Sequence, residues 1–458
     1  MNDVVNDVAH TVAHEVTERA GDGATADPAV AAAPRARTGL RRLVLFLPGH
    51  DPTPMSYHHG RFANQAGRFG ALWSFTVDVG PRVDAGARPF AQWTVTSAGP
   101  NWRATTDYRI LAWDDIVRTL DARPDPVRLW RGLGGLTDFL FGGAARGYFR
   151  ASPRYGFFFF FPYLMVLLFA LGGLIAGGLA FLLLAGPLGT GGAALAGAAV
   201  GLAAFFALFR WPGRHWRLHQ ALDDWDLARD YLHGKTPSLD ARLDDFAAGL
   251  VAAAQSGTYD EILLVGHSLG ATLILAVIDR ALDRDPALAA GPTRIGLLTC
   301  GATIPKLALH ARGEKVRRQA ARVAGTPGLT WVEYQGRHDA INFYKFHPVT
   351  LRPAGFDAIE GSAPLLRNAN IKHMLTPQKL KRVRKRPMRV HYQFLLANER
   401  QASYDYFMFA LGPLGFADLT ARPEGPLGRF AQDGALVDGT LIDGTLIGGT
   451  SAGGAPTA

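Results

Sequence analysis

Residues 261–282 read EILLVGHSLGATLILAVIDRAL. The apolar run Glu261–Val265 predicts a short buried strand, and Ala271–Leu282 predicts a helix. Between them, Ser268 lies in the pattern G-x-S-x-G, flanked by glycines at both ends of the motif. A strand, a tight turn and a helix in this order form a nucleophile elbow, which holds a serine in a strained backbone conformation. The stretch therefore predicts an α/β protein with Ser268 as a nucleophile.

The motif alone is a weak signal because the chain holds 53 glycines in 458 residues. An ordinary glycine-rich turn is the alternative interpretation. The flanking strand and helix favour the elbow. The helix that follows would place its positive dipole end behind Ser268, where it can stabilise a negatively charged oxygen.

Outward from this stretch, short apolar runs alternate with helical patterns. Residues 219–254 have helical periodicity with acidic residues on the exposed face. Short strands separated by helices predict a mostly parallel sheet with helices on both faces. The remaining strand candidates are Leu43–Leu47, Leu72–Val79, Trp93–Ser97, Tyr108–Trp113, Arg294–Thr299, Leu329–Tyr334 and Arg389–Leu396.

Residues 156–209 contain no Asp, Glu, Lys, Arg or His. Phe157–Leu184 is long enough to span a bilayer, and Gly192–Phe209 is near the minimum length. Ala185–Gly191 predicts a turn between them, and the second half is rich in Gly and Ala, which let helices approach closely in lipid. We predict a transmembrane helical hairpin; two buried helices in a soluble core are the alternative.

Arginines flank the apolar stretch on both sides. The excess of positive charge predicts that both flanks face the cytoplasm. The chain would then be an integral membrane protein with two transmembrane helices, with both termini and all other segments cytoplasmic. The flanking residues are Arg146, Arg150, Arg154, Arg210, Arg214 and Arg217.

The domain organisation follows from these segments. Composition predicts disorder in residues 1–39, rich in Ala, Gly, Pro and Asp, and in the Gly-rich tail 421–458. Residues 40–155 and 211–420 would form the two parts of one catalytic domain, with the hairpin, 156–210, inserted between them.

The G-H-S-L-G elbow resembles that of the α/β-hydrolase superfamily, in particular its lipase-like and esterase-like members. The resemblance covers roughly Leu40–Gly412, interrupted by the hairpin. It implies a catalytic triad in the chain order serine, acid, histidine. Asp339, which follows the predicted strand Leu329–Tyr334, matches the position of the acid; Asp357 is a weaker competitor.

The resemblance leaves the histidine open. His391, in the last strand candidate, is the first choice, and His373, in a loop, is the second. His347 lies only eight residues after Asp339, too near to have crossed to the next strand. The resemblance also implies an oxyanion hole formed by the backbone N–H groups of Leu269 and His50.

The chain carries a formal net charge of +9, and positive charge is dense over Lys372–Arg389. Anionic lipid head groups are the partner that we expect, because no aromatic platform or nucleic-acid-binding module accompanies the basic run. A solvated helix face is the alternative. Cys300 is the single cysteine, follows an apolar run and is expected to be buried. We expect no metal and no organic cofactor.

These features predict a membrane-anchored serine hydrolase that cleaves acyl esters or thioesters, with lipid-derived substrates favoured by the location. A catalytically silent hydrolase-fold scaffold, which recruits partners at the membrane, is the alternative.

Overall fold

The computed structural model describes residues 39–84, 90–357, 363–437, 441–442 and 445–446. The predicted disorder of residues 1–39 therefore falls almost entirely outside the described residues, as does most of the predicted tail after residue 437. Ala421–Val437, which we assigned to the same tail, differs from that prediction because it packs onto the sheet. Leu436 is buried, and the Trp102 indole N–H donates to the Gly434 carbonyl oxygen at 2.9 Å.

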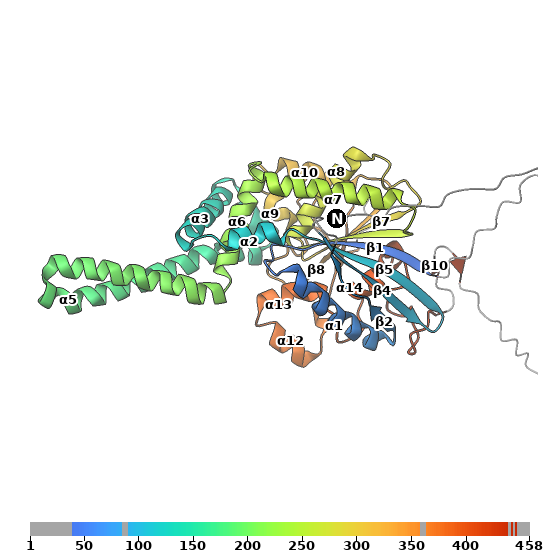
Figure 1. Ribbon diagram of the computed structural model, residues 1–458, viewed down its shortest axis with the longest axis horizontal. Helices are drawn as coiled ribbons and strands as arrows, with labels where there is room; N and C mark the ends of the chain where they lie inside the picture. Colours follow the sequence, from blue (N-terminus) through green and yellow to red (C-terminus); the bar gives the residue numbers. More distant parts are fainter. Residues whose placement is uncertain (1–38, 85–89, 358–362, 438–440, 443–444, 447–458) are drawn as a thin grey trace, which may run out of the picture. The chain divides into compact units, whose positions relative to one another are not determined.

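The fold is α/β, built on a mixed sheet in the order β2-β4-β5-β1-β6-β7-β8-β9, with β3 paired to β4 (Figure 1). The six strands β5, β1, β6, β7, β8 and β9, in this spatial order, are parallel. At the other end of the sheet, β4 pairs antiparallel with β5, β2 and β3. The strands are β1 (Leu40–Leu47), β2 (Thr76–Val79), β3 (Val83–Asp84), β4 (Phe90–Gly99), β5 (Trp102–Leu111), β6 (Glu261–His267), β7 (Arg294–Cys300), β8 (Leu329–Gln335) and β9 (Leu365–Asn368).

The parallel strands agree with the predicted mostly parallel sheet, but the antiparallel end of the sheet was not predicted. Two residues, Pro100 and Asn101, separate β4 from β5. A connection this short can join only antiparallel strands. Two small strands, β10 (Leu441–Ile442) and β11 (Thr445–Leu446), pair separately.

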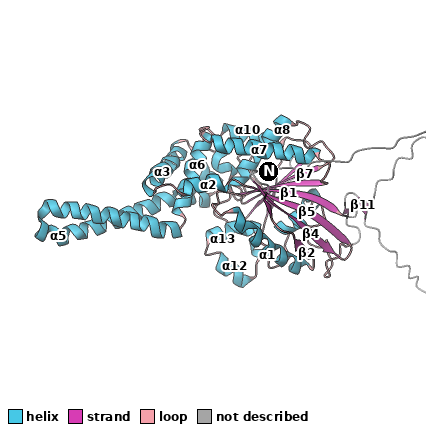
Figure 2. Ribbon diagram, in the orientation of Figure 1, coloured by secondary structure: helices cyan, strands magenta, loops and turns pink. Residues whose placement is uncertain are grey.

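Helices pack on both faces of the sheet (Figure 2). On one side lie α2 (Asp114–Asp121), α3 (Asp125–Phe141), α4 (Ala144–Ala151), α6 (Leu218–Leu232), α7 (Pro237–Gln255), α8 (Leu269–Arg284), α9 (Ile304–Ala308) and α10 (Glu314–Ala324). On the other lie α1 (Met55–Trp73), α11 (Ile371–Met374), α12 (Pro377–Val383), α13 (Pro387–His391), α14 (Tyr406–Leu411) and α15 (Phe416–Thr420).

The apolar stretch forms one long helix, α5 (Pro153–His215), where the sequence predicts two helices and a turn. The predicted turn, Ala185–Gly191, remains within the helix except at Gly189, whose φ of 65° and ψ of 172° are not helical. A single glycine accommodates the change of direction because it tolerates positive φ. The segments before and after Gly189 lie side by side (Figure 1). A Cβ atom on Gly177 would lie 2.6 Å from the Gly197 carbonyl oxygen, so the two backbones are in contact.

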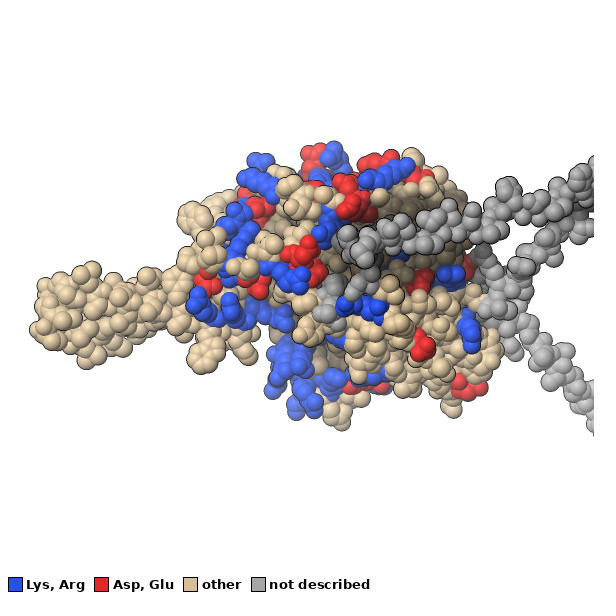
Figure 3. Space-filling view, in the orientation of Figure 1, with Lys and Arg blue, Asp and Glu red and all other residues tan. Residues whose placement is uncertain are grey.

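Helix α5 is long and apolar enough to cross a membrane. Its most apolar 18-residue window has a mean hydropathy of 2.5, and only 11% of that window is buried. Figure 3 shows the projecting part of α5 without charged side chains on the visible face. The two ends of the helix are attached to the rest of the fold, since Tyr155, Phe159, Phe169 and Phe209 are buried in its hydrophobic core.

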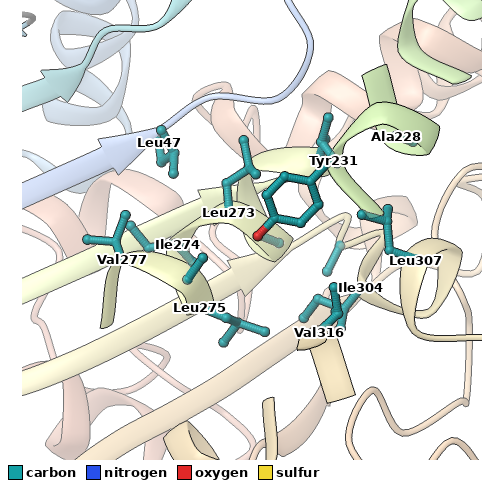
Figure 4. Close-up of a cluster of buried hydrophobic side chains, with 14 of the residues drawn as sticks. Leu47, Ala228, Tyr231, Leu273, Ile274, Leu275, Val277, Ile304, Leu307 and Val316 are labelled. Carbon is teal, nitrogen blue, oxygen red and sulfur yellow. The ribbon is translucent and has the colours of Figure 1, made fainter. Parts of the chain in front are cut away.

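The central strand β1 shows how the core is divided. Leu43, Leu45 and Leu47 join the cluster beneath α8, whereas Val44 and Phe46 point to the opposite face, toward α1 and α14. This alternation is that of a strand buried on both faces. Figure 4 shows part of the first cluster, in which Leu273 of α8 lies beside Tyr231 and Ile304 lies beside Val316.

Candidate active site

Ser268 sits at the tip of β6, directly before α8, with φ of 56° and ψ of −126°. A positive φ is strained for a residue with a Cβ atom. Close packing on both sides holds this turn in place. A Cβ atom on Gly266 would lie 2.6 Å from Ala271 Cα, and one on Gly270 would lie 2.6 Å from the Pro48 carbonyl oxygen. The motif therefore needs glycine at both positions, and Ser268 has the backbone geometry that the sequence predicts for it.

Asp339 and His391 lie in direct contact. His391 Nδ1 is 2.7 Å from Asp339 Oδ2, and both side chains are buried. Asp339 lies in the loop after β8, and its other oxygen, Oδ1, accepts a hydrogen bond of 2.9 Å from the Ile341 N–H. This second bond fixes the carboxylate, which then orients the imidazole through Nδ1.

The second ring nitrogen, His391 Nε2, is buried and has no hydrogen-bond partner among the described residues. A buried polar atom without a partner costs free energy, so its presence calls for an explanation. With the Nδ1 proton held by Asp339, Nε2 carries a lone pair and can accept a proton.

The loop after β7 connects Ser268 with His391. The Ser268 N–H donates to the Cys300 carbonyl oxygen at 3.4 Å, and the Thr303 N–H donates to the Ser268 carbonyl oxygen at 3.3 Å. Gly301, between Cys300 and Thr303, packs on the imidazole: a Cβ atom there would lie 3.1 Å from His391 Cε1. The serine and the histidine therefore lie on either side of one short loop, at the carboxyl edge of the parallel strands.

His267, the residue before Ser268, also contacts His391. Its ring lies 4.5 Å from the His391 ring, and its Nε2 is 3.1 Å from the His391 carbonyl oxygen. Burial, followed by the charge of His391, lowers the pKa of His267 well below its usual range. A neutral His267 therefore supports the backbone of His391 without adding charge to the site.

The loop after β1 approaches the serine from the other side. A Cβ atom on Gly49 would lie 2.8 Å from Ser268 Cβ and 3.3 Å from Ser268 Oγ, so only glycine fits there. The next residue, His50, is buried, and its carbonyl oxygen accepts a 2.6 Å hydrogen bond from Gln220 Nε2. The contact places the segment that carries the His50 N–H beside Ser268, which is where the predicted oxyanion donor would have to lie. Leu269 occupies the first position of α8, directly after Ser268.

The same loop is tied to the histidine segment. Asp51 Oδ2 accepts a 3.0 Å hydrogen bond from the Tyr392 hydroxyl, and Tyr392 directly follows His391. Asp51 Oδ1 accepts bonds from the N–H and the hydroxyl of Thr53. Nothing in the sequence distinguishes Tyr392 from a core aromatic residue, because its partner lies 341 residues away.

The competing candidates lie elsewhere. His373 is exposed, and its described hydrogen bond runs from its own backbone N–H to Asn370. Asp357 pairs with Arg367. His347 Nδ1 accepts backbone N–H groups of Val349 and Thr350. Of the histidines considered, the structure places only His391 against Asp339. Asp357, the alternative acid, contacts none of them among the described interactions. The environment predicted for His391 was wrong: residues 389–396 end α13 and form a 3-10 turn, Tyr392–Leu395, in place of a strand.

Cys300 is buried, as the sequence predicts, and burial raises its pKa to about 12. The thiol is therefore unreactive at neutral pH. Among the described residues, no group of three or more His, Cys, Asp or Glu side chains is arranged to hold a metal ion.

No family model, curated protein or solved structure matches this chain. The assignment of a function therefore depends on the geometry of the site itself.

Proposed function

We propose that the protein is a serine hydrolase of the α/β-hydrolase type that cleaves acyl esters or thioesters, with Ser268, His391 and Asp339 as its catalytic residues. The observation that carries the proposal is the buried His391–Asp339 contact of 2.7 Å, one loop away from a serine with φ of 56°. The buried Nε2 of His391, which has no partner among the described residues, supports a role as proton acceptor. The chain order of the three residues matches that of the superfamily.

The reaction follows from these roles. Ser268 Oγ attacks the carbonyl carbon of the substrate while its proton passes to His391 Nε2, and the carbonyl oxygen becomes negatively charged. The N–H groups of Leu269 and His50 stabilise that oxyanion. The oxyanion collapses, the C–O or C–S bond breaks, and the leaving group takes the proton from His391. Water then attacks the acyl-serine ester with His391 as base, which releases the acid and restores Ser268.

The membrane location rests on α5. We propose that α5 crosses the bilayer twice, reversing direction at Gly189, with the arginine flanks and the catalytic domain in the cytoplasm. Exposed apolar side chains along both segments support this topology, as does the backbone contact between Gly177 and Gly197, which is typical of helices packed in lipid.

The attachment of α5 supports a substrate drawn from the membrane. Tyr155, in the first turn of α5, packs on Phe343 with ring centroids 4.1 Å apart. Phe343 lies four residues after Asp339, in the same loop. Arg154 donates to the Arg337 carbonyl oxygen, two residues before Asp339. The base of the apolar helix therefore borders the loop that carries the catalytic acid, and acyl lipids near the bilayer surface are the substrates that fit.

A fluorophosphonate probe tests the proposal, because it reacts with a serine only when a base and an oxyanion hole activate it. Detergent-solubilised protein is expected to be labelled, and labelling should disappear in Ser268→Ala and His391→Gln. The matched control, His373→Gln, should be labelled like the wild type. Absence of labelling in the folded wild type would refute the proposal and favour a catalytically silent scaffold at the membrane.

A further inference from the structure

Helices α11 to α13 carry a dense group of exposed cations. We call this group the basic surface; it consists of Lys372, Lys381, Arg382, Arg384, Lys385, Arg386 and Arg389. In the part of the chain that the structure describes, no carboxylate forms an ion pair with any of these side chains. The neighbouring Lys379, by contrast, is paired with Glu399 at 2.8 Å and is left out of the group.

Several cations elsewhere on the domain are paired with carboxylates. Arg131 and Arg229 both pair with Asp226, at 2.9 and 2.6 Å. Arg242 pairs with Asp115 at 2.9 Å. Figure 3 shows this difference, with blue and red mixed over the upper part of the domain and blue gathered over α12 and α13. Unpaired like charges repel one another, so their retention in one place points to an anionic partner.

The basic surface continues to the base of α5 and to the loop that carries the catalytic acid. Arg154, in the first turn of α5, donates to the Arg337 carbonyl oxygen. A Cβ atom on Gly336 would lie 2.9 Å from Ile371 Cδ1. The loop that carries Asp339, which we call the acid loop, therefore packs against α11. Cations of α5, α11 and the end of α12 therefore lie near the acid loop.

The pKa of His338, which lies within the acid loop, is affected by these nearby cations. Partial burial, followed by the charges of Arg154, Arg337, Arg384 and Lys372, lowers its pKa below the usual value. The imidazole is therefore neutral at pH 7 and does not add to the positive charge.

We infer that the basic surface binds the anionic head groups of the cytoplasmic leaflet and thereby holds the loop that carries Asp339 at the lipid surface. This inference rests on the membrane anchoring in the proposed function. If α5 lies in the bilayer, its base lies at head-group level, and the basic surface adjoins that base. Negative lipid at that depth attracts Lys and Arg within about one Debye length, roughly 10 Å at 0.1 M salt.

The proposed catalytic base, His391, lies in the same short segment as two cations of the basic surface. His391 is the last residue of α13; Arg386 is the N-cap of this short helix, and Arg389 lies in its middle. The helix that would contact lipid is therefore the same helix that carries the proposed catalytic base.

A fluorescent reporter on α12 tests the inference. Gln378→Cys places a thiol at an exposed, uncharged position, and buried Cys300 resists labelling. The full-length labelled protein is placed in lipid nanodiscs of zwitterionic lipid alone or with about 30% anionic phosphatidylglycerol, and quenching by neutral acrylamide is measured. We expect the quenching constant to fall at least about twofold in the anionic discs and to recover in 1 M salt.

Two charge variants complete the test. Lys381→Gln, Arg384→Gln and Lys385→Gln together should abolish the protection. A matched triple variant of exposed cations outside the basic surface should retain it: Arg103→Gln, Lys235→Gln and Arg318→Gln.

Equal quenching in both kinds of disc would overturn the inference. Protection by a short RNA but not by anionic lipid would overturn it in favour of a nucleic-acid surface. Fluorophosphonate labelling of the same samples reports the catalytic proposal separately, so failure of one is distinguishable from failure of the other.

Discussion

Asp339→Asn removes the negative charge that faces His391 and keeps the shape of the side chain. In the variant, the amide oxygen can still accept the 2.9 Å hydrogen bond from the Ile341 N–H. The amide NH₂ group then takes the place of Oδ2, which lies 2.7 Å from His391 Nδ1. An NH₂ group donates, so Nδ1 must accept and the imidazole proton moves to Nε2. The nitrogen that faces the reaction can then no longer take a proton from Ser268.

The wrong tautomer and the lost stabilisation of imidazolium together are worth about 10⁴-fold in kcat. That factor corresponds to about 5.4 kcal/mol of transition-state free energy. The assay is hydrolysis of a p-nitrophenyl ester by detergent-solubilised protein, with thermal unfolding measured alongside to establish that the variant is folded.

The matched control is Asp357→Asn, since Asp357 lies in the same region of the chain and pairs with Arg367 instead of a histidine. It should retain kcat within about twofold, because its carboxylate pairs with Arg367 and contacts neither Asp339 nor His391. A folded Asp339→Asn variant with kcat near that of the wild type would refute the assignment of the acid.

Three further changes test other parts of the structure. Gly49→Ala places a Cβ atom 2.8 Å from Ser268 Cβ and should slow fluorophosphonate labelling at least about tenfold, whereas unchanged labelling would show that the loop can move aside. Gly177→Leu inserts a side chain where a Cβ atom already lies 2.6 Å from a facing carbonyl oxygen, and should lower the thermal midpoint in detergent; Gly178→Leu, with open space around it, is the control and should not. Burial raises the pKa of Glu333 to about 7, above its ordinary value near 4.5. The folded state therefore holds a proton that the unfolded state releases, and stability is lost as pH rises from about 4.5 through 7. Glu333→Gln should stabilise the protein at pH 8, by up to about 3 kcal/mol, but not at pH 4, and equal thermal shifts at the two pH values would contradict the assignment.

The sequence predicts the centre of the sheet well and its edges poorly. The elbow could be located because Glu261–Val265 and the helix after Ser268 are both strongly patterned and adjacent. The apolar run Leu72–Val79 was assigned to one strand, but Leu72 and Trp73 end α1, and β2 begins at Thr76. Short apolar runs have the same composition in a buried strand and in the last turn of a buried helix, so periodicity does not separate them.

The histidine illustrates a second limit. Alternation of apolar residues after Arg389 favours a strand, yet Pro387 starts a helix, as proline does at a first helical position. Chain order nevertheless favours His391, the histidine that contacts Asp339 in the structure, whereas the supports of the site were not predicted. Tyr392 and Asp51, and Gly301 and His391, meet only in the folded chain. Contacts across so much sequence leave no local pattern.

The position of β1 has a consequence for synthesis on the ribosome. Its neighbours are β5, made soon after it, and β6, whose Glu261 pairs with Arg42 across 219 residues. At 5–20 residues per second, translation of that interval takes about 10–45 s. During this time the β6 side of the most apolar strand has no partner, and an unpaired apolar edge invites aggregation. Helix α5 is made within the same interval, so the nascent chain releases its most apolar segment before the sheet can close. The unpaired edge of β1 and the apolar segment of α5 are therefore exposed at the same time during synthesis.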